Sequence, residues 1–267
     1  MGLDRPLAGK VALISGTAAG IGRAAALAFA AAGAKVFGCD VNAAGSDETI
    51  ELVRAAGGTM RSLHPVDVST PEGAKTWTTA AVEAFGGIDV LYNNAAVNHS
   101  RTSFPESTFE QWELALRYEL TIVYTSSFAA WPHLIERGGG LIINVGSIAG
   151  HQELWPYRSA AHGTTKAAVI AFTRMLAADG AAHNIRAVSI SPGVIHAPSK
   201  DWLLSAESPR AATGRALIGK VPMGRPGSVD EIASVAVFLA SPSASYINAT
   251  DILVDGGFMG VSWSSAP

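Results

Sequence analysis

The chain has little cysteine and little charge. A single cysteine, Cys39, cannot form an internal disulfide, which fits the reducing cytoplasm. Charged residues make up only 15% of the 267 residues while 48% are hydrophobic, so we expect part of the surface to be covered by other subunits of a homo-oligomer. The length suits one sizeable domain with a well-buried core.

Several sequence patterns are missing. The net charge of −3 and the lack of any block of like charges argue against a nucleic-acid partner. No apolar run reaches membrane-spanning length, and residues 1–6 contain no apolar signal-peptide core, so we expect a cytoplasmic protein with no membrane partner. Histidines do not occur at tight metal-ligand spacing, and we expect no metal site.

A glycine-rich turn follows the first apolar run. The run covers 11–14, the turn reads Ser-Gly-Thr-Ala-Ala-Gly-Ile-Gly, and an alanine-rich helical segment comes next. Gly16 permits a tight turn off a strand, Gly20 permits close approach of the backbone to a pyrophosphate, and Gly22 permits close packing of the helix on the sheet. This order predicts a nucleotide-binding unit, in which Thr17 and Ile21 belong to the same phosphate-facing turn.

An acidic residue ends the next strand. The strand covers 35–39, and Asp40 follows it, with Val41 beside it. A carboxylate at this place can accept hydrogen bonds from a ribose diol and would repel a 2′-phosphate. The sequence therefore predicts NAD rather than NADP as the cofactor.

Apolar strands alternate with helical lengths along the rest of the chain. This pattern predicts an α/β fold, with a doubly wound parallel sheet and helices on both faces, in one domain over 1–267. The segment 197–226 holds four prolines and breaks the alternation, and we interpret it as a flap over the substrate. The expected helices cover 46–56, 71–85, 108–136, 158–179 and 229–240, and the further strands cover 60–64, 88–92, 141–145, 185–190 and 252–254.

Seven ordered motifs extend over nearly the whole chain, and with them the sequence resembles the short-chain dehydrogenase/reductase family. The resemblance implies a seven-stranded Rossmann sheet and a tetramer or dimer packed through the two long helices. The motifs are the glycine turn, Asp67-Val68, Asn93-Asn94-Ala95, Asn144-Val145-Gly146-Ser147, Lys166, Pro192-Gly193 and Asp255-Gly256-Gly257.

The same resemblance assigns the cofactor residues. Asp67 and Val68 would face the adenine, and Asn94 and Ala95, with Ala96 next in the chain, would pass beneath the adenosine ribose. Pro192, Gly193 and Ile195 would run along the nicotinamide, while Lys166 would bond to the nicotinamide ribose.

The chain departs from the family around the nicotinamide. The family's usual tyrosine, four residues before the lysine, is His162, and the asparagine expected seven residues after Trp112 is Glu119. The threonine that would follow the Pro-Gly turn is Ala197, and the family's last glycine of Asn-Asn-Ala-Gly is Ala96. The motifs expected around the adenine are intact, so these changes affect only the nicotinamide side of the expected site.

His162 is the expected proton acceptor. The reference pKa of imidazole is about 6.5, against about 10 for a phenol, and positive neighbours disfavour imidazolium, which favours alcohol oxidation. Imidazole Nε2 ends roughly 2 Å nearer the backbone than a tyrosine hydroxyl, so a water or a deeper substrate must fill the gap. Glu119 either orients His162 or balances the charge of Lys166.

Other candidates complete the expected site. Ser147 would donate to a carbonyl oxygen or accept from an alcohol, although its position also suits a simple helix cap. Tyr157 is an alternative proton donor. His99, His151 and His196 fall at the carboxyl edge of the sheet, where ligands bind, and with Trp155 and Trp202 we expect them to contact the substrate.

The sequence thus predicts an NAD(H)-dependent enzyme that interconverts a small, apolar secondary alcohol and its ketone. Two alternatives stay open: a lyase, isomerase or hydrolase on the same scaffold, and a protein that binds NAD without catalysis. The substrate's identity and the number of subunits do not follow from the residues.

Overall fold

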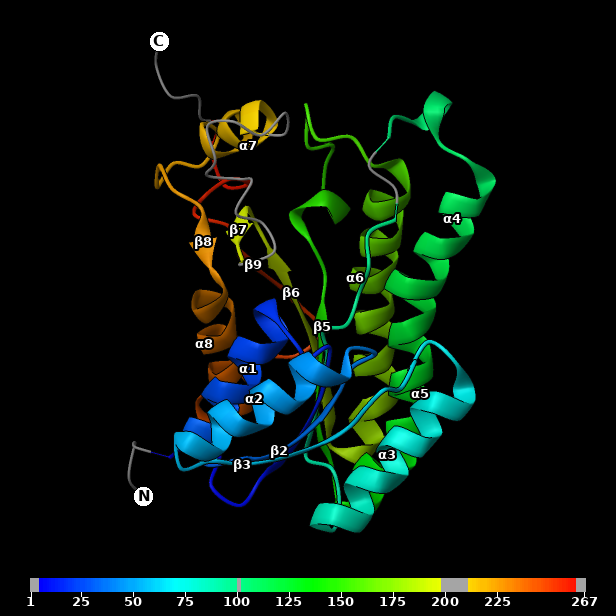
Figure 1. Ribbon diagram of the computed structural model, residues 1–267, viewed down its shortest axis with the longest axis vertical. Coiled ribbons are helices and arrows are strands. Elements are labelled where there is room, and N and C mark those ends of the chain that lie inside the picture. Colours follow the sequence, from blue (N-terminus) through cyan, green and yellow to red (C-terminus); the bar gives the residue numbers. More distant parts are fainter. Residues whose placement is uncertain (1–4, 100–101, 198–210, 263–267) are drawn as a thin grey trace.

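A seven-stranded parallel sheet forms the centre of the protein (Figure 1). The computed structural model describes residues 5–99, 102–197 and 211–262. The strand order is β3-β2-β1-β4-β5-β6-β9. The strands are β1 (Val11–Ser15), β2 (Lys35–Cys39), β3 (Thr59–Leu63), β4 (Val90–Asn93), β5 (Gly140–Val145), β6 (Ile185–Pro192) and β9 (Asp251–Val254).

Helices cover both faces of this sheet, which confirms the expected fold class (Figure 1). They are α1 (Gly20–Ala31), α2 (Ala43–Ala55), α3 (Pro71–Phe85), α4 (Phe109–Ala115), α5 (Ile122–Glu136), α6 (Ala160–Gly180), α7 (Ala211–Ile218) and α8 (Val229–Ala240). Within the described part of the chain no helix is both long enough and apolar enough to span a membrane.

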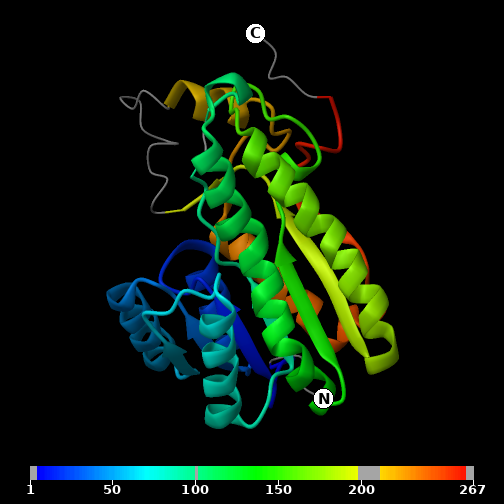
Figure 2. The ribbon, with the colours of Figure 1, turned by 90° about the vertical axis from the view of Figure 1, so that its right-hand side faces the viewer.

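Two apolar cores lie on opposite faces of the sheet. On one face α1, α2 and α8 pack on β1 and β2, and small side chains such as Ala25 let the helices approach closely. On the other face α3, α5 and α6 pack around the fully buried Trp77. The helices α5 and α6 lie side by side on this second face (Figure 2).

Several element boundaries differ from the expectations. The strand expected over 88–92 begins at Val90, because Asp89 before it turns its carboxylate to Lys10 and Arg137 instead of continuing the apolar strand. The helix expected over 108–136 consists of α4, a π-helical turn η2 (Leu116–Thr121) and α5. The expected flap over 197–226 contains α7, while 198–210 lie outside the described residues. Two short strands border the flap and pair with each other, β7 (Ile195–His196) before it and β8 (Gly227–Ser228) after it.

The strand order reverses direction between β1 and β4. These two strands pair in parallel, so their carboxyl ends open at the same edge, and the connections that leave them run to opposite faces. In doubly wound sheets ligands bind in the crevice at this switch point. Ser15 and Asn94 join the two strand ends, since Asn94 Nδ2 donates to the Ser15 carbonyl oxygen at 3.0 Å.

Candidate functional site

A cavity of about 420 Å³ lies at the switch point. Ten of the residues expected to bind a cofactor line it: Gly16, Gly20, Ile21, Asp40, Val41, Asp67, Val68, Asn94, Ala95 and Ala96. Tyr118, Ile122 and Ala197 extend its wall, and the sequence did not suggest the first two. Thr17 and Gly22 lie behind this lining, since Thr17 is fully buried and its Oγ1 faces the Cys39 carbonyl oxygen.

The glycine turn has the shape that a dinucleotide needs. A Cβ on Gly22 would lie 1.9 Å from the Gly16 carbonyl oxygen, and one on Gly16 would lie 2.9 Å from Asn94 Nδ2. Gly20 adopts a φ of +57° with no atom within 4 Å of its Cβ position, so its surface is open. Because Ala19 provides no side-chain cap for α1, the first N–H groups of the helix are suited to a pyrophosphate.

Asp40 is held in place by the backbone around the cavity. Its two carboxylate oxygens accept from the N–H groups of Ala18 at 3.0 Å and Asn42 at 2.9 Å. Each oxygen keeps a further lone pair, so the carboxylate can still accept from a ribose diol. The structure thus places a fixed acceptor where the sequence indicated one.

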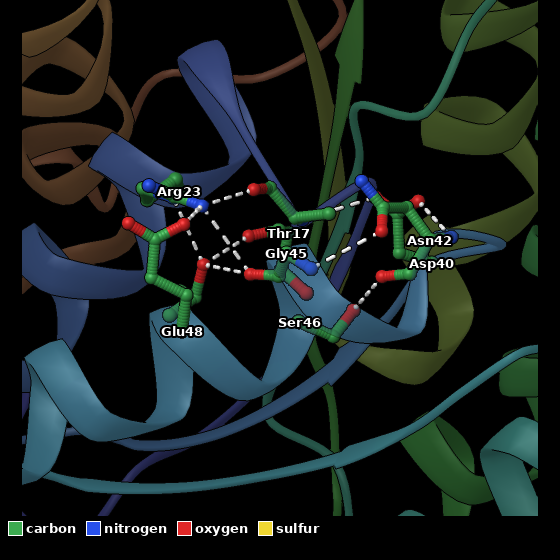
Figure 3. Close-up of polar contacts among 9 residues, drawn as sticks. Thr17, Arg23, Asp40, Asn42, Gly45, Ser46 and Glu48 are labelled. Atoms are coloured by element: carbon green, nitrogen blue, oxygen red, sulfur yellow. Dashed lines mark hydrogen bonds and ion pairs between the residues drawn. The ribbon is translucent and has the colours of Figure 1, made fainter.

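The guanidinium of Arg23 is bonded to several partners beside the glycine turn (Figure 3). The Arg23 guanidinium donates to the Ala18 carbonyl oxygen at 2.5 Å and to Glu48 Oε2 at 2.6 Å, and its Nε donates to Thr49 Oγ1 at 3.0 Å. These bonds bind the guanidinium to α2 and to the glycine turn. Sequence reasoning missed this network, because no local motif pairs residues 25 positions apart.

The far end of the cavity contains a second cluster. Arg117 donates to Ser69 Oγ at 3.0 Å and to Asp67 Oδ2 at 3.2 Å, and its guanidinium lies 5.1 Å from the centre of the Tyr118 ring. The His99 ring lies 5.4 Å from the same tyrosine ring. Asp67 therefore lies at the cavity wall, and His99 packs on Tyr118, which lines the same cavity. The sequence singled out neither Arg117 nor Tyr118, and substrate contact by His99 stays a prediction.

His162 and Glu119 are directly bonded. His162 Nδ1 lies 2.9 Å from Glu119 Oε2, and Thr165 Oγ1 donates to the same oxygen at 2.5 Å. Glu119 is 1% exposed, whereas 17% of the His162 side chain is exposed. An ionised carboxylate only accepts, so Nδ1 carries the hydrogen of this bond and Nε2 of a neutral imidazole is left with its lone pair.

The π-helical turn η2 carries Glu119 into this position. Such turns shift the side chains that follow them relative to an ordinary helix and are frequent at functional sites. Burial raises the pKa of Glu119, but the hydrogen bonds from His162 and Thr165 and the charge of Lys166 outweigh burial and keep the pKa below its ordinary value. Glu119 is therefore an anion at neutral pH.

Lys166 is buried next to this pair. It is 4% exposed, and its Nζ donates to the Val145 carbonyl oxygen at 2.9 Å, at the carboxyl end of β5. Burial lowers the pKa of Lys166, and the Glu119 charge opposes part of that effect. Bonding of Lys166 to a nicotinamide ribose stays a prediction.

Ser147 and Tyr157 flank His162 on the loops. Ser147 Oγ accepts from the Ala149 N–H at 3.1 Å, so the helix-cap role is present in this structure. Tyr157 lies in the loop before α6 and accepts at its hydroxyl from Asn98 Nδ2 at 2.9 Å. Tyr157 and His162 both line a second cavity of about 270 Å³.

The residues expected along the nicotinamide lie apart from the 420 Å³ cavity lining. Pro192 ends β6, and a Cβ on Gly193 would lie 2.6 Å from Asp255 Cα, which shows a close approach of two backbones. Ile195 is buried in β7. Ala197 reaches the cavity, so the end of this segment does border it.

The candidate substrate residues are scattered. His151 Nε2 lies 2.8 Å from Asp251 Oδ2, which ties the residue to β9, so substrate contact by His151 stays a prediction. Trp155 is exposed with Arg158 stacked on its ring at 4.0 Å, and His196 lies in β7. Trp202 falls outside the described residues. Within the described ranges no group of three or more His, Cys, Asp or Glu could hold a metal.

Comparison with known proteins gives consistent matches over nearly the whole chain. The family model described as enoyl-(acyl carrier protein) reductase matches residues 16–259. The 2,5-dichloro-2,5-cyclohexadiene-1,4-diol dehydrogenase of Sphingobium indicum is 36% identical over 253 residues, which are 94% of this chain and 97% of that protein.

Solved structures are similar as well. A short-chain dehydrogenase/reductase from Burkholderia xenovorans has a TM-score of 0.87 at 33% identity, over 96% of this chain and 98% of that one. A 2-deoxy-D-gluconate 3-dehydrogenase from Agrobacterium tumefaciens with bound NADP has a TM-score of 0.85 at 30% identity, over 97% of this chain and all of that one (100%).

Proposed function

Since the chain belongs to the short-chain dehydrogenase/reductase family and is an oxidoreductase of that family, we propose that it interconverts a small secondary alcohol and its ketone with NAD(H). The observation that supports the proton chemistry most directly is the 2.9 Å bond between His162 Nδ1 and Glu119 Oε2. A bound nicotinamide ring would supply the hydride acceptor or donor.

In this proposal His162 Nε2 accepts the hydroxyl proton of the alcohol during oxidation. Glu119 keeps the Nδ1–H tautomer and stabilises the imidazolium that forms, as a carboxylate does when it orients a catalytic histidine. Ser147 Oγ holds the reacting oxygen, and Lys166 binds the ribose hydroxyls of the cofactor. Tyr157, bonded to Asn98, is the alternative donor beside the same cavity.

The choice of NAD over NADP is supported by Asp40 and Arg23. A 2′-phosphate next to the Asp40 carboxylate would be repelled, and Arg23, which could offset that repulsion, is already bonded to Glu48. The similar structure from Agrobacterium tumefaciens contains NADP, so the experiment compares NAD⁺ with NADP⁺ directly.

The substrate is proposed to be small and apolar, with one reacting hydroxyl. The 270 Å³ volume of the cavity beside His162 supports the small size, and Ala149 and Leu154 support an apolar part, while Gln152 and Glu153 add polar lining. Residues 197–226 would form the flap over it, and His99, His151, His196, Trp155 and Trp202 are proposed contacts.

We also propose that the protein is a homo-oligomer in the cytoplasm. Each chain would fold as one domain. The outer surface of α5 and α6 exposes Tyr124, Phe128 and Met175, with the Tyr124 ring 5.8 Å from Phe172. An apolar stripe of this kind favours burial against another subunit. The buried thiol of Cys39 fits a reducing compartment.

The test is cofactor reduction across a panel of secondary alcohols, followed by the near-ultraviolet absorbance of reduced nicotinamide, with NAD⁺ and NADP⁺ in parallel. We expect turnover with NAD⁺, and a loss of about 10²- to 10⁴-fold in kcat for His162→Gln, the range for removing a general base. The exposed His183→Gln is the matched control and should keep full activity. Turnover without an absorbance change would replace this proposal with non-redox chemistry, and dinucleotide binding without turnover would replace it with a binding role.

A further inference from the structure

Glu119 places a negative charge in the interior of the protein. Its Oε2 accepts both hydrogen bonds, from His162 and Thr165, whereas its buried Oε1 has no partner among the described residues. At 1% exposure the carboxylate has almost no contact with water. The field of such a charge is screened far less than that of a surface group.

The positive charge next to this carboxylate does not bond to it directly. Lys166 Nζ donates to the Val145 carbonyl oxygen, and the coupling between Lys166 and Glu119 acts through space. One buried cation and one buried anion therefore face the same region, and the local formal charge is balanced. A neutral residue at position 119 would leave Lys166 uncompensated.

We propose that Glu119 makes the site select the oxidised form of the cofactor, by raising the affinity for NAD⁺ relative to NADH. The inference rests on the proposed function, because it requires a nicotinamide beside Lys166 and His162. The two forms of the cofactor differ by one positive charge on the nicotinamide ring. A buried anion attracts that charge, and Lys166 alone would repel it.

The same carboxylate also suits the charge movement of alcohol oxidation. His162 Nε2 would take the hydroxyl proton of the alcohol, and a bound nicotinamide would supply the acceptor for the hydride and its two electrons, which leaves the ketone. The site would lose the positive charge of the oxidised ring and gain one on the imidazole, to which Glu119 is already bonded. Glu119 therefore favours a cation in the site before and after the transfer.

The experiment measures dissociation constants of NAD⁺, NADH and ADP-ribose by calorimetry on the full chain. Glu119→Gln should lower the NAD⁺ affinity relative to NADH by about tenfold, the size expected for one poorly screened unit charge. ADP-ribose, which lacks the ring, should bind with an unchanged constant. Lys166→Met should shift the same ratio in the opposite direction, and the double variant should lie near the wild type.

Two controls make the outcome specific. Glu119→Asp keeps the charge and should keep the ratio, and Glu113→Gln removes an exposed carboxylate from the same helical stretch and should leave all three constants unchanged. An unchanged ratio in both Glu119→Gln and Lys166→Met would overturn the inference while leaving the proposed function intact. A wild type that binds neither NAD⁺ nor NADH would overturn both.

Discussion

His162 on α6 and Glu119 in η2, 43 residues apart, share a hydrogen bond of 2.9 Å. The sequence predicts that both positions depart from the family pattern, and the structure places the two side chains in direct contact. The carboxylate accepts, and the imidazole Nδ1–H donates. We therefore expect the two residues to act as one unit.

His162→Tyr should therefore lose activity as a single variant. The activity should return when Glu119 is replaced as well. The phenol reaches further than the imidazole, removes the N–H donor from a buried carboxylate, and would have to ionise beside that carboxylate. We expect a loss of about 10²-fold in kcat for His162→Tyr, the order of one misplaced proton-transfer group. The double variant His162→Tyr/Glu119→Asn should regain most of it, with a pH optimum moved upward.

Steady-state rates against pH for the wild type, both single variants and the double variant complete this cycle. Glu119→Asn alone tests whether the carboxylate is needed with imidazole. If the two effects add without a coupling energy, the two residues act independently and the paired role is wrong.

Asp40→Ser should relax the choice of cofactor. Loss of the carboxylate removes the repulsion of a 2′-phosphate together with an acceptor for the ribose diol. We expect the affinity for NAD⁺ to fall by about tenfold and the preference over NADP⁺ to disappear, as measured by fluorescence titration, since one charge-assisted hydrogen bond is worth about 1.5 kcal/mol or more. Asp47→Asn, an exposed carboxylate on α2, should change neither constant, and an unchanged preference in Asp40→Ser would remove Asp40 from the site.

Asp89→Asn should lower stability without touching the site. Burial raises the pKa of Asp89, but Arg137, the Val11 N–H and Lys10 outweigh burial and leave it lowered. A lowered pKa means that the stabilisation is present above the ordinary aspartate pKa and is lost as the pH falls through the folded-state value. We expect a loss of about 2–4 kcal/mol at neutral pH, toward the size for breaking a buried pair.

Denaturant unfolding at several pH values checks this expectation. The difference between Asp89→Asn and the wild type should begin to shrink below about pH 3.9, where the carboxyl of the unfolded chain takes up a proton, and should be lost once the pH falls below the lowered pKa of the folded state. Glu136→Gln, exposed on α5, is the control. A difference that stays constant down to acid pH would mean that the ion pairs do not carry the effect.

Phe128→Glu should dissociate the proposed oligomer. Phe128 is 72% exposed and stacks with Tyr124 at 6.1 Å on the α5 surface. A charge in the centre of a buried contact leaves an unpaired carboxylate in an apolar environment, which is strongly unfavourable. Light scattering after gel filtration should show a smaller species, whereas Phe109→Glu, an equally exposed phenylalanine on α4, should not change the mass.

Local sequence identified residues that the structure brings together around the 420 Å³ cavity. The glycine turn and Asp40 lie within one strand-turn-helix-strand unit, so their relative placement follows from a short stretch of chain. The strand alternation also predicted the sheet, because the central strands β1, β4 and β5 are buried on both faces and are therefore apolar along most of their length.

Other contacts around the site join elements that are distant from each other in the sequence. The bond between Arg23 and Glu48 and the bond between His151 and Asp251, 100 residues apart, depend on how helices and strands pack, which no local pattern encodes. The sequence did offer Glu119 as a partner of His162, but it left open a pairing with Lys166, and only the packing of α6 against η2 distinguishes the two.

The π-helical turn η2 also limits which changes of length this helix can accept. Its wider i→i+5 winding accommodates one residue more than an α-helical turn would, and so keeps α4 and α5 in register. Deleting a single residue between 116 and 121 would restore α-helical winding and change the directions of the side chains inside the turn, while α4 and α5 keep their places. Arg117 and Glu119 both lie in this turn, so their contacts with Asp67 and with His162 depend on the same extra residue.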